Sequence, residues 1–189
     1  MIRAIAFAVV AAAVACAPAA KTRKDSVSPK SPLNPACRDA ILAFADLQLD
    51  RWHGLPACTH DDLATVLGAG GAEWKGGYGL IHIYAGHAAT PTGITVHFRG
   101  ERAAYLIASG ERLPRASIET MLGPPEAVAP SRLFEPQNEQ WIYASRGLTL
   151  HVHRGSHEPL RIYGYEPMTV EQFKESELFY EEASEHPSH

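Results

Sequence analysis

Cysteine and net charge are both scarce in this chain. Its 189 residues include only three cysteines, and 17 Lys and Arg against 21 Asp and Glu give a formal net charge of −4. A general nucleic-acid-binding protein would need a basic face, so this balance argues against that class. Beyond the N-terminal region, no apolar run approaches the roughly 20 residues that a transmembrane helix needs. Any membrane attachment is therefore expected through the N-terminus.

The chain also lacks the short motifs of several enzyme classes. It contains no G-x-S-x-G and no H-E-x-x-H, the motifs of serine hydrolases and zinc proteases. The glycine-rich segment 68–71, followed by Lys75, lacks the spacing of a phosphate-binding loop, and we interpret it as a helix cap and loop. His60-Asp61-Asp62 is better explained by helix capping. We therefore predict no catalytic residue, no cofactor and no enzymatic activity.

The N-terminal segment has the pattern of an export signal. Arg3 gives a short positive start, residues 4–15 form an apolar run, and Cys16 follows it. An apolar run of about a dozen residues is too short to span a bilayer but is typical of a secretory signal. We therefore predict a signal peptide over residues 1–15.

The small residues before Cys16 resemble the lipobox of bacterial lipoproteins. In that family the cysteine is lipidated and becomes the first mature residue. The family usually has Leu where Ala13 stands, and Ala13-Val14-Ala15 also fits an ordinary A-x-A cleavage site. Both interpretations predict export. We expect lipidation at Cys16 and a place in the bacterial cell envelope, as an outer-membrane lipoprotein facing the periplasm or the cell surface.

Cys37 and Cys58 remain once Cys16 is set aside. An even pair of cysteines in an exported, oxidising compartment favours a disulfide. The bond would close a loop of about 20 residues, which stabilises a fold by roughly 3 kcal/mol. Two buried reduced thiols are the alternative. A zinc site is less favoured, because no second C-x-x-C or H-x-x-x-H pattern accompanies the pair.

The chain divides into a tether, one folded domain and a tail. Residues 16–36 are rich in Ser, Pro and Lys, which predicts a flexible tether. The folded domain is expected over residues 37–183, and a disordered tail over 184–189. Apolar spacing predicts helices over 38–51, from an N-cap at Thr59 to Gly68, over 116–122 and over 170–183. Alternation predicts strands over 79–84, 93–98, 103–108, 139–144, 147–152 and 160–165.

Three motifs recur in the same order along the domain. Leu67-Gly68 corresponds to Leu122-Gly123, Ile83-Tyr84 to Ile142-Tyr143, and segment 93–98 to segment 147–152. Their spacing is nearly constant, which indicates an internal repeat with halves of about 37–110 and 111–168. The sequence thus predicts an α+β fold of two tandem helix-plus-antiparallel-sheet repeats, with the helices on one face of the sheet.

These features resemble the superfamily that includes the β-lactamase-inhibitory protein and the small SmpA/OmlA outer-membrane lipoproteins. Gly123-Pro124-Pro125-Glu126, followed by Trp141-Ile142-Tyr143, is similar to the LGxP…WxY pattern of that superfamily. The likeness covers roughly residues 59–165. It implies two stacked repeats and protein binding rather than catalysis. It transfers no partner and no individual binding residue.

The strand alternation defines a candidate binding surface. If the apolar residues of segments 93–98 and 147–152 face the helices, the residues between them face the opposite way: Thr95, His97, Thr149, His151 and His153. With nearby Tyr and Trp, such a face suits protein recognition. If the sheet brought His97, His151 and His153 together, they could bind zinc or copper. Solvent-facing alternation alone also explains these histidines, so we predict no metal.

The sequence therefore predicts an exported, lipid-anchored protein-binding module that is not an enzyme. Its expected partner is an unknown envelope protein, its membrane contact is the N-terminal lipid, and nucleic acid is excluded. One alternative is a histidine-based metal-binding protein, or a metal-dependent enzyme, on the outer sheet face. A second alternative is a structural accessory lipoprotein.

Overall fold

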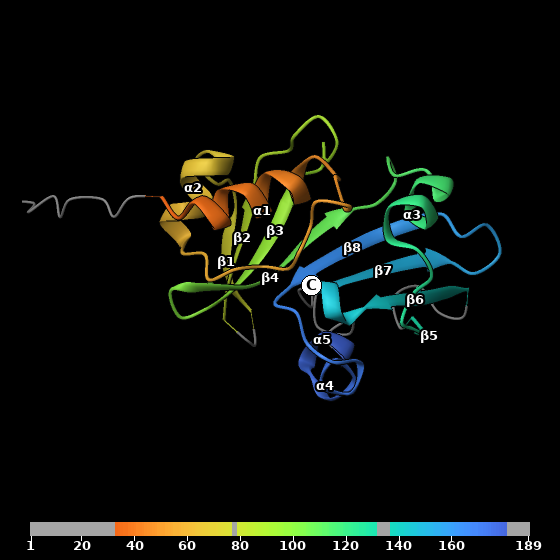
Figure 1. The fold of residues 1–189 in the computed structure, drawn as a ribbon. Helices are drawn as coiled ribbons and strands as arrows, with labels where there is room; N and C mark the ends of the chain where they lie inside the picture. The colour runs from red at the N-terminus through yellow and green to blue at the C-terminus, as the bar shows by residue number, and fades with distance from the viewer. Residues whose placement is uncertain (1–32, 77–78, 132–136, 181–189) are drawn as a thin grey trace, which may run out of the picture. The chain divides into compact units, whose positions relative to one another are not determined.

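The computed structural model describes residues 33–76, 79–131 and 137–180. The predicted signal peptide, Cys16, most of the tether and the tail lie outside these residues. The described part is an α+β fold, with helices packed on one eight-stranded antiparallel sheet (Figure 1). Within it, no helix combines the length and the apolar character needed to cross a membrane.

The described residues form five α-helices and one short 3-10 helix. The helical elements are α1 (Pro35–Ala45), α2 (His60–Leu67), α3 (Arg115–Leu122), η1 (Ala144–Arg146), α4 (Val170–Glu175) and α5 (Glu177–Tyr180). The strands are β1 (Glu73–Gly76), β2 (Gly79–Tyr84), β3 (Ile94–Arg99), β4 (Arg102–Ser109), β5 (Ala127–Pro130), β6 (Asn138–Tyr143), β7 (Leu148–His153) and β8 (Pro159–Tyr165).

The sheet has the strand order β1-β2-β3-β4-β8-β7-β6-β5. The first four strands of the chain thus form one half of the sheet, the last four form the other, and β4 and β8 join the halves. Strands β1 and β5 are the two edges. Each is only four residues long, and short edge strands limit edge-to-edge aggregation.

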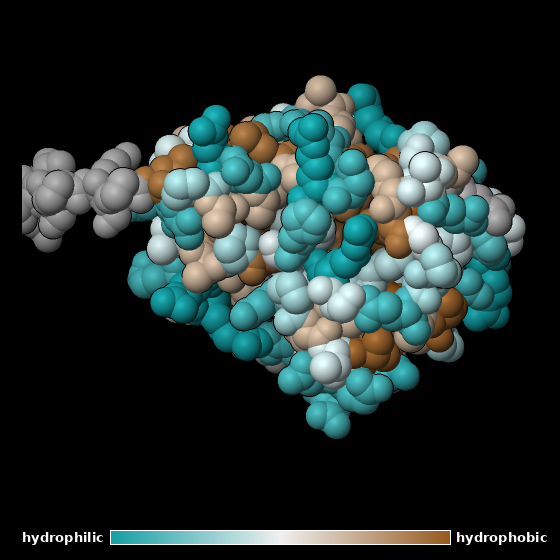
Figure 2. Space-filling view, viewed as in Figure 1, coloured by the Kyte–Doolittle hydropathy of each residue, from teal (hydrophilic) through white to brown (hydrophobic). Residues whose placement is uncertain are grey.

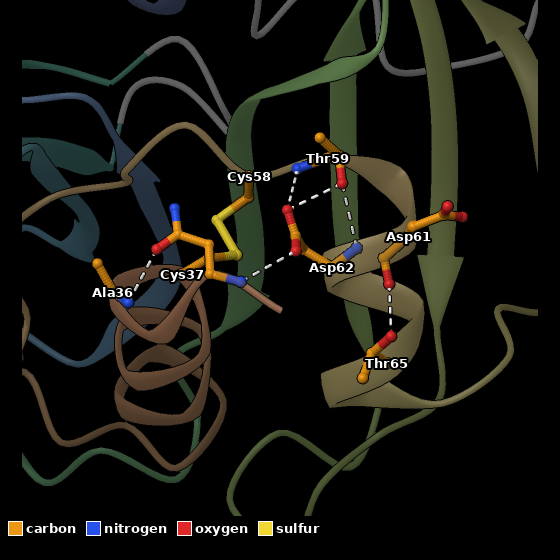
Figure 3. Close-up of a disulfide and its surroundings, with 8 residues drawn as sticks. Ala36, Cys37, Cys58, Thr59, Asp61, Asp62 and Thr65 are labelled. Atoms are coloured by element: carbon orange, nitrogen blue, oxygen red, sulfur yellow. Dashed lines mark hydrogen bonds between the residues drawn. A yellow bond between two sulfur atoms is a disulfide. The ribbon is translucent and has the colours of Figure 1, made fainter. Parts of the chain in front are cut away.

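A disulfide and a shared carboxylate fix α1 against the start of α2 (Figure 3). Cys37 and Cys58 are bonded, with their Cα atoms 5.5 Å apart, so the predicted disulfide is confirmed. Thr59 caps α2 in a capping box with Asp62, as the sequence predicted for Thr59. The Asp62 carboxylate also accepts from the Asn34 backbone N–H at 3.4 Å. Partial burial raises the pKa of Asp62, but the hydrogen bonds from Thr59 and Asn34 together outweigh it and hold that pKa below its usual value.

Helices α1, α2 and α3 pack on one face of the sheet over the larger core. Phe44 and Trp52 are fully buried there, and the Trp52 indole N–H donates to the Gly147 carbonyl at 3.1 Å. Both rings lie against Gly164 on β8, where an added Cβ would stand 2.7 Å from a Phe44 carbon and 2.9 Å from a Trp52 carbon. A glycine at position 164 therefore lets these rings lie directly on the sheet.

The opposite face is covered by α4 and α5, which form a second core with β4, β6 and β8. Phe173 is 1% exposed, and its ring stacks on Tyr165 with centroids 5.3 Å apart. The prediction that helices occupy one face only is therefore wrong. The predicted helix 170–183 is also corrected, because α4 ends at Glu175 and Ser176, in extended backbone, separates it from α5. Residues 181–183 lie outside the described part.

Candidate functional site

The five residues of the predicted binding surface lie on β3 and β7, and most of them are buried. The apolar residues of these strands face the helices as predicted. Ile94, Val96, Leu148 and Leu150 all belong to the core under α1–α3. His97, Thr149 and His151 are nevertheless 9%, 1% and 2% exposed, and only Thr95 and His153 are partly exposed. The prediction of an open recognition surface is thus wrong. Sequence alternation separates two faces, but it does not reveal that both are covered.

His97 is packed within the second face. Its Nδ1 lies 2.6 Å from the Tyr105 hydroxyl, and the two rings stack with centroids 4.2 Å apart. Burial lowers the pKa of His97 to about 4, because the charged imidazolium would lose its hydration. His97 is therefore neutral at physiological pH and acts as a packed aromatic side chain.

The predicted histidine set does not converge on one ion. His97 lies on β3, and His151 and His153 lie on β7, with β4 and β8 between them. Three strand spacings separate them, roughly 14 Å, which no single metal can bridge. His151 instead contacts the Ser131 hydroxyl at 2.9 Å. The metal interpretation of these three residues is therefore wrong.

A different cluster does converge, at the junction of α2 with β1 and β2. It consists of His60, Glu73 and His82, whose potential ligand atoms all lie within 4.8 Å of one another. His60 is the first residue of α2, directly after the capping residue Thr59. Glu73 and His82 are cross-strand partners on β1 and β2. The His82 Nδ1 atom lies 3.2 Å from His60 Nε2 and 3.2 Å from Glu73 Oε2.

The surroundings hold the His82 ring in place. His82 is 6% exposed, and its ring stacks on Tyr84 at a centroid distance of 4.5 Å. Its Nε2 has no hydrogen-bond partner and lies against Gly70, where a Cβ would overlap the ring. The Tyr84 hydroxyl is also buried without a partner. Burial, followed by the charges of Glu73 and Asp61, raises the pKa of Tyr84 to about 12.

Sequence reasoning missed this cluster because it missed β1. The tetrapeptide Glu73-Trp74-Lys75-Gly76 is too short to show alternation, so nothing placed Glu73 opposite His82. His60 was explained by its position in a capping sequence. The sequence offers one signal for this cluster: a His at a helix start (His60), then an acidic residue (Glu73) and a second His on a predicted strand (His82).

A groove of about 530 Å³ lies at the other end of the sheet, between α3 and β5–β6. Its apolar lining includes Pro124, Pro125, Val128 and Trp141. Val128 and Trp141 are cross-strand partners, and the Trp141 ring contacts His157 edge-on at 5.1 Å. Val128 is 54% exposed. Figure 2 shows hydrophobic residues at the surface on the β5–β6 side of the molecule.

Comparison with known proteins gives one distant structural likeness. No family model matches this chain, and no curated protein matches it. A DUF4309 family protein, YjgB, from Bacillus subtilis is similar, with 14% sequence identity, coverage of 68% of this chain and 98% of that chain, and a TM-score of 0.43. A likeness at that TM-score supports no argument about this chain. The resemblance to the β-lactamase-inhibitory-protein superfamily stays a prediction.

Proposed function

We propose that this chain is an exported, lipid-anchored envelope protein whose folded domain binds another protein and catalyses no reaction. The apolar groove beside β5 carries the proposal. Val128 and Trp74 are the two large hydrophobic residues of the described part that are clearly exposed, at 54% and 41%, and Val128 lines the groove. An exposed apolar side chain beside a concave surface with an apolar lining is a common feature of binding sites. This groove replaces the buried face of β3 and β7 as the proposed interface.

The groove and the sheet edge together support a proposal about the chemistry of the partner. Strand β5 is the last strand of the sheet, and no described strand pairs with its outer edge. An extended segment could add to that edge through backbone hydrogen bonds while one apolar side chain enters the groove between Pro125 and Trp141. The proposed partner is therefore a protein with an extended segment that carries an aliphatic or aromatic anchor.

The disulfide supports the proposed location. Disulfides persist in oxidising compartments and are rare in reducing ones. With Cys37 and Cys58 bonded, Cys16 is the remaining cysteine of the three, and it stands at the predicted lipidation position. Mass spectrometry of the mature protein should find a diacylglycerol adduct on Cys16. An unmodified N-terminus would contradict the lipid anchor and leave an ordinary signal peptide.

We also propose that the two halves of the sheet are tandem repeats. Two irregularities support this. The β3–β4 register shifts directly after His97, and the β7–β8 register shifts directly after His151, at equivalent positions of the sequence repeat. Gly68 and Gly123 end α2 and α3 with similar backbone angles, φ 87° and ψ −179° against φ 71° and ψ −164°. Bulges and caps at matched positions are expected of duplicated units.

Site-specific photo-crosslinking tests the interface. A benzophenone amino acid at position 128, in cells that export the full chain, should give a discrete adduct with one protein. The same amino acid at position 74, on the opposite edge strand, is the matched control and should not. Val128→Arg should weaken binding of the captured protein at least tenfold, and Trp74→Arg should leave it unchanged. No adduct at position 128, or equal effects of both substitutions, would favour the accessory structural role.

A further inference from the structure

We propose that His60, Glu73 and His82 form a site for one divalent transition-metal ion, with Zn²⁺ as the best chemical fit. The ligand atoms would be His60 Nε2, His82 Nδ1 and Glu73 Oε2. This site is independent of the proposed protein-binding groove, and it uses none of the histidines on β3 or β7. Among the residues that the structure describes, no other group of three His, Cys, Asp or Glu ligand atoms converges in this way.

The distances between the ligand atoms suit a tetrahedral ion. Zinc lies about 2.0–2.2 Å from His nitrogen and carboxylate oxygen, so neighbouring ligand atoms stand roughly 3.4 Å apart. The two contacts of His82 Nδ1 are both 3.2 Å. The third ligand pair is also within 4.8 Å. An ion can therefore occupy the centre of the cluster with small side-chain adjustments.

Hydrogen bonding alone leaves the cluster unsatisfied. A ring nitrogen of neutral His has either one N–H or one lone pair in the ring plane, so it serves one close partner well. His82 Nδ1 has two, His60 Nε2 and Glu73 Oε2. If it donates to Glu73, its single proton is either shared with a lone pair on His60 Nε2 or faces a second N–H on that atom. If it accepts from His60, its lone pair faces the carboxylate. A cation accepts a lone pair from all three atoms at once.

The fold holds the three ligands before any ion arrives. The capping box of Thr59 and the disulfide at Cys58 fix the start of α2, and with it His60. Glu73 is fixed opposite His82 by the β1–β2 ladder. Stacking on Tyr84 and close packing on Gly70 restrict the His82 ring. Such preorganisation reduces the cost of ordering ligands on binding.

Access and coordination number follow from burial. The His82 side chain is 8% exposed, whereas that of Glu73 is 52% exposed. An ion can thus enter from the Glu73 side and bind against the buried imidazole. Three protein ligands leave a fourth position of the tetrahedron for water, as in zinc sites that remain open to a further ligand.

Titration of the tag-free, metal-stripped full chain with ZnCl₂ tests the site, using isothermal calorimetry for stoichiometry and affinity. One strong Zn²⁺ equivalent is expected. Glu73→Gln should weaken it at least tenfold, and His60→Ala should remove it. The matched control is His53→Ala, at an exposed histidine outside the cluster, which should retain wild-type binding. Thermal melts and the intact disulfide verify that each variant is folded.

Titration with Co²⁺ gives a second measurement, because the visible absorption of the bound ion reports its coordination geometry. Co²⁺ bound with tetrahedral geometry absorbs visible light strongly, whereas hexa-aquo Co²⁺ does not. The wild type and His53→Ala should show this absorption and His60→Ala should not. The proposal is overturned if Zn²⁺ binds equally to the wild type and to His60→Ala and Glu73→Gln, or if no saturable binding occurs. In the second case the cluster is a hydrogen-bonded network only.

Discussion

Acid should destabilise this protein through His97 in a defined pH window. The pKa of His97 is about 4 in the folded chain because the ring is buried, and it is about 6.5 in the unfolded chain. Between these values the unfolded state binds a proton that the folded state does not. The contribution of neutral His97 to the free energy of unfolding is therefore fully present above about pH 6.5, and it is lost as the pH falls towards 4. At pH 4.5 the expected loss from this residue is about 2.5 kcal/mol.

His97→Gln isolates that contribution. Glutamine cannot be protonated, yet its side chain can still hydrogen-bond the Tyr105 hydroxyl. Urea unfolding at pH 7.5 and pH 4.5 gives the acid-induced loss of stability for each protein. Carboxylates and the other histidines titrate in both, so the difference between the two losses belongs to His97. The wild type should lose about 2.5 kcal/mol more than the variant. Equal losses would refute the reasoning, and would mean that His97 is solvated or protonated in the fold.

Three further substitutions test the packing. Cys37→Ala removes the disulfide and should lower the free energy of unfolding by roughly 3 kcal/mol, measured by urea denaturation; unchanged stability would contradict its structural role. Phe173→Ala should cost about 3–5 kcal/mol because the ring is 1% exposed, and a smaller loss would indicate that α4 detaches readily from the sheet. Gly164→Ala should lower the melting temperature by several degrees, an expected loss of about 1–3 kcal/mol, since the new methyl would crowd Phe44 and Trp52; an unchanged melting temperature would show that these rings can move.

Local patterns located most strands within a residue or two. The segment 79–84 matches β2 as predicted, and 147–152 differs from β7 by one residue at each end. Alternation over six residues carries enough information for such strands. The four-residue strands β1 and β5 carry too little, and both were missed. Yet β1 supplies a metal-ligand candidate and β5 supplies the groove, so the shortest elements decide the functional interpretation.

Apolar spacing overextended the first helix. The predicted range 38–51 continues through Leu49 and Trp52, which recur at helical intervals. In the structure α1 runs from Pro35 to Ala45, and Leu47 adopts a positive φ of 55°. Leu49 and Trp52 are still buried, because the loop after α1 turns back onto the sheet. Because tertiary position decides which residues are buried, buried apolar residues in a loop can by chance have the spacing of a helix.

The proposed duplication connects the two candidate sites. His82 pairs with Val96, and Trp141 pairs with Leu150, at equivalent points of the two sheet halves. By the same register, Glu73 on β1 corresponds to Val128 on β5, since these residues face His82 and Trp141 respectively. The metal-ligand cluster and the apolar groove are then one location in two copies, where a short helix approaches an edge hairpin.

Under the proposed duplication, the two proposed sites would be two versions of one position in the architecture. In the proposed repeat, the Glu73–His82 pair of the first half corresponds to the Val128–Trp141 pair of the second. Potential metal ligands in one half thus stand where apolar side chains stand in the other. The two proposals consequently make separable demands. Loss of zinc binding in His60→Ala should leave the crosslink at position 128 intact, because the sites lie at opposite ends of the sheet. If the crosslink disappears together with the metal, the ion acts on the whole sheet, and the assignment of independent roles to the two halves is wrong.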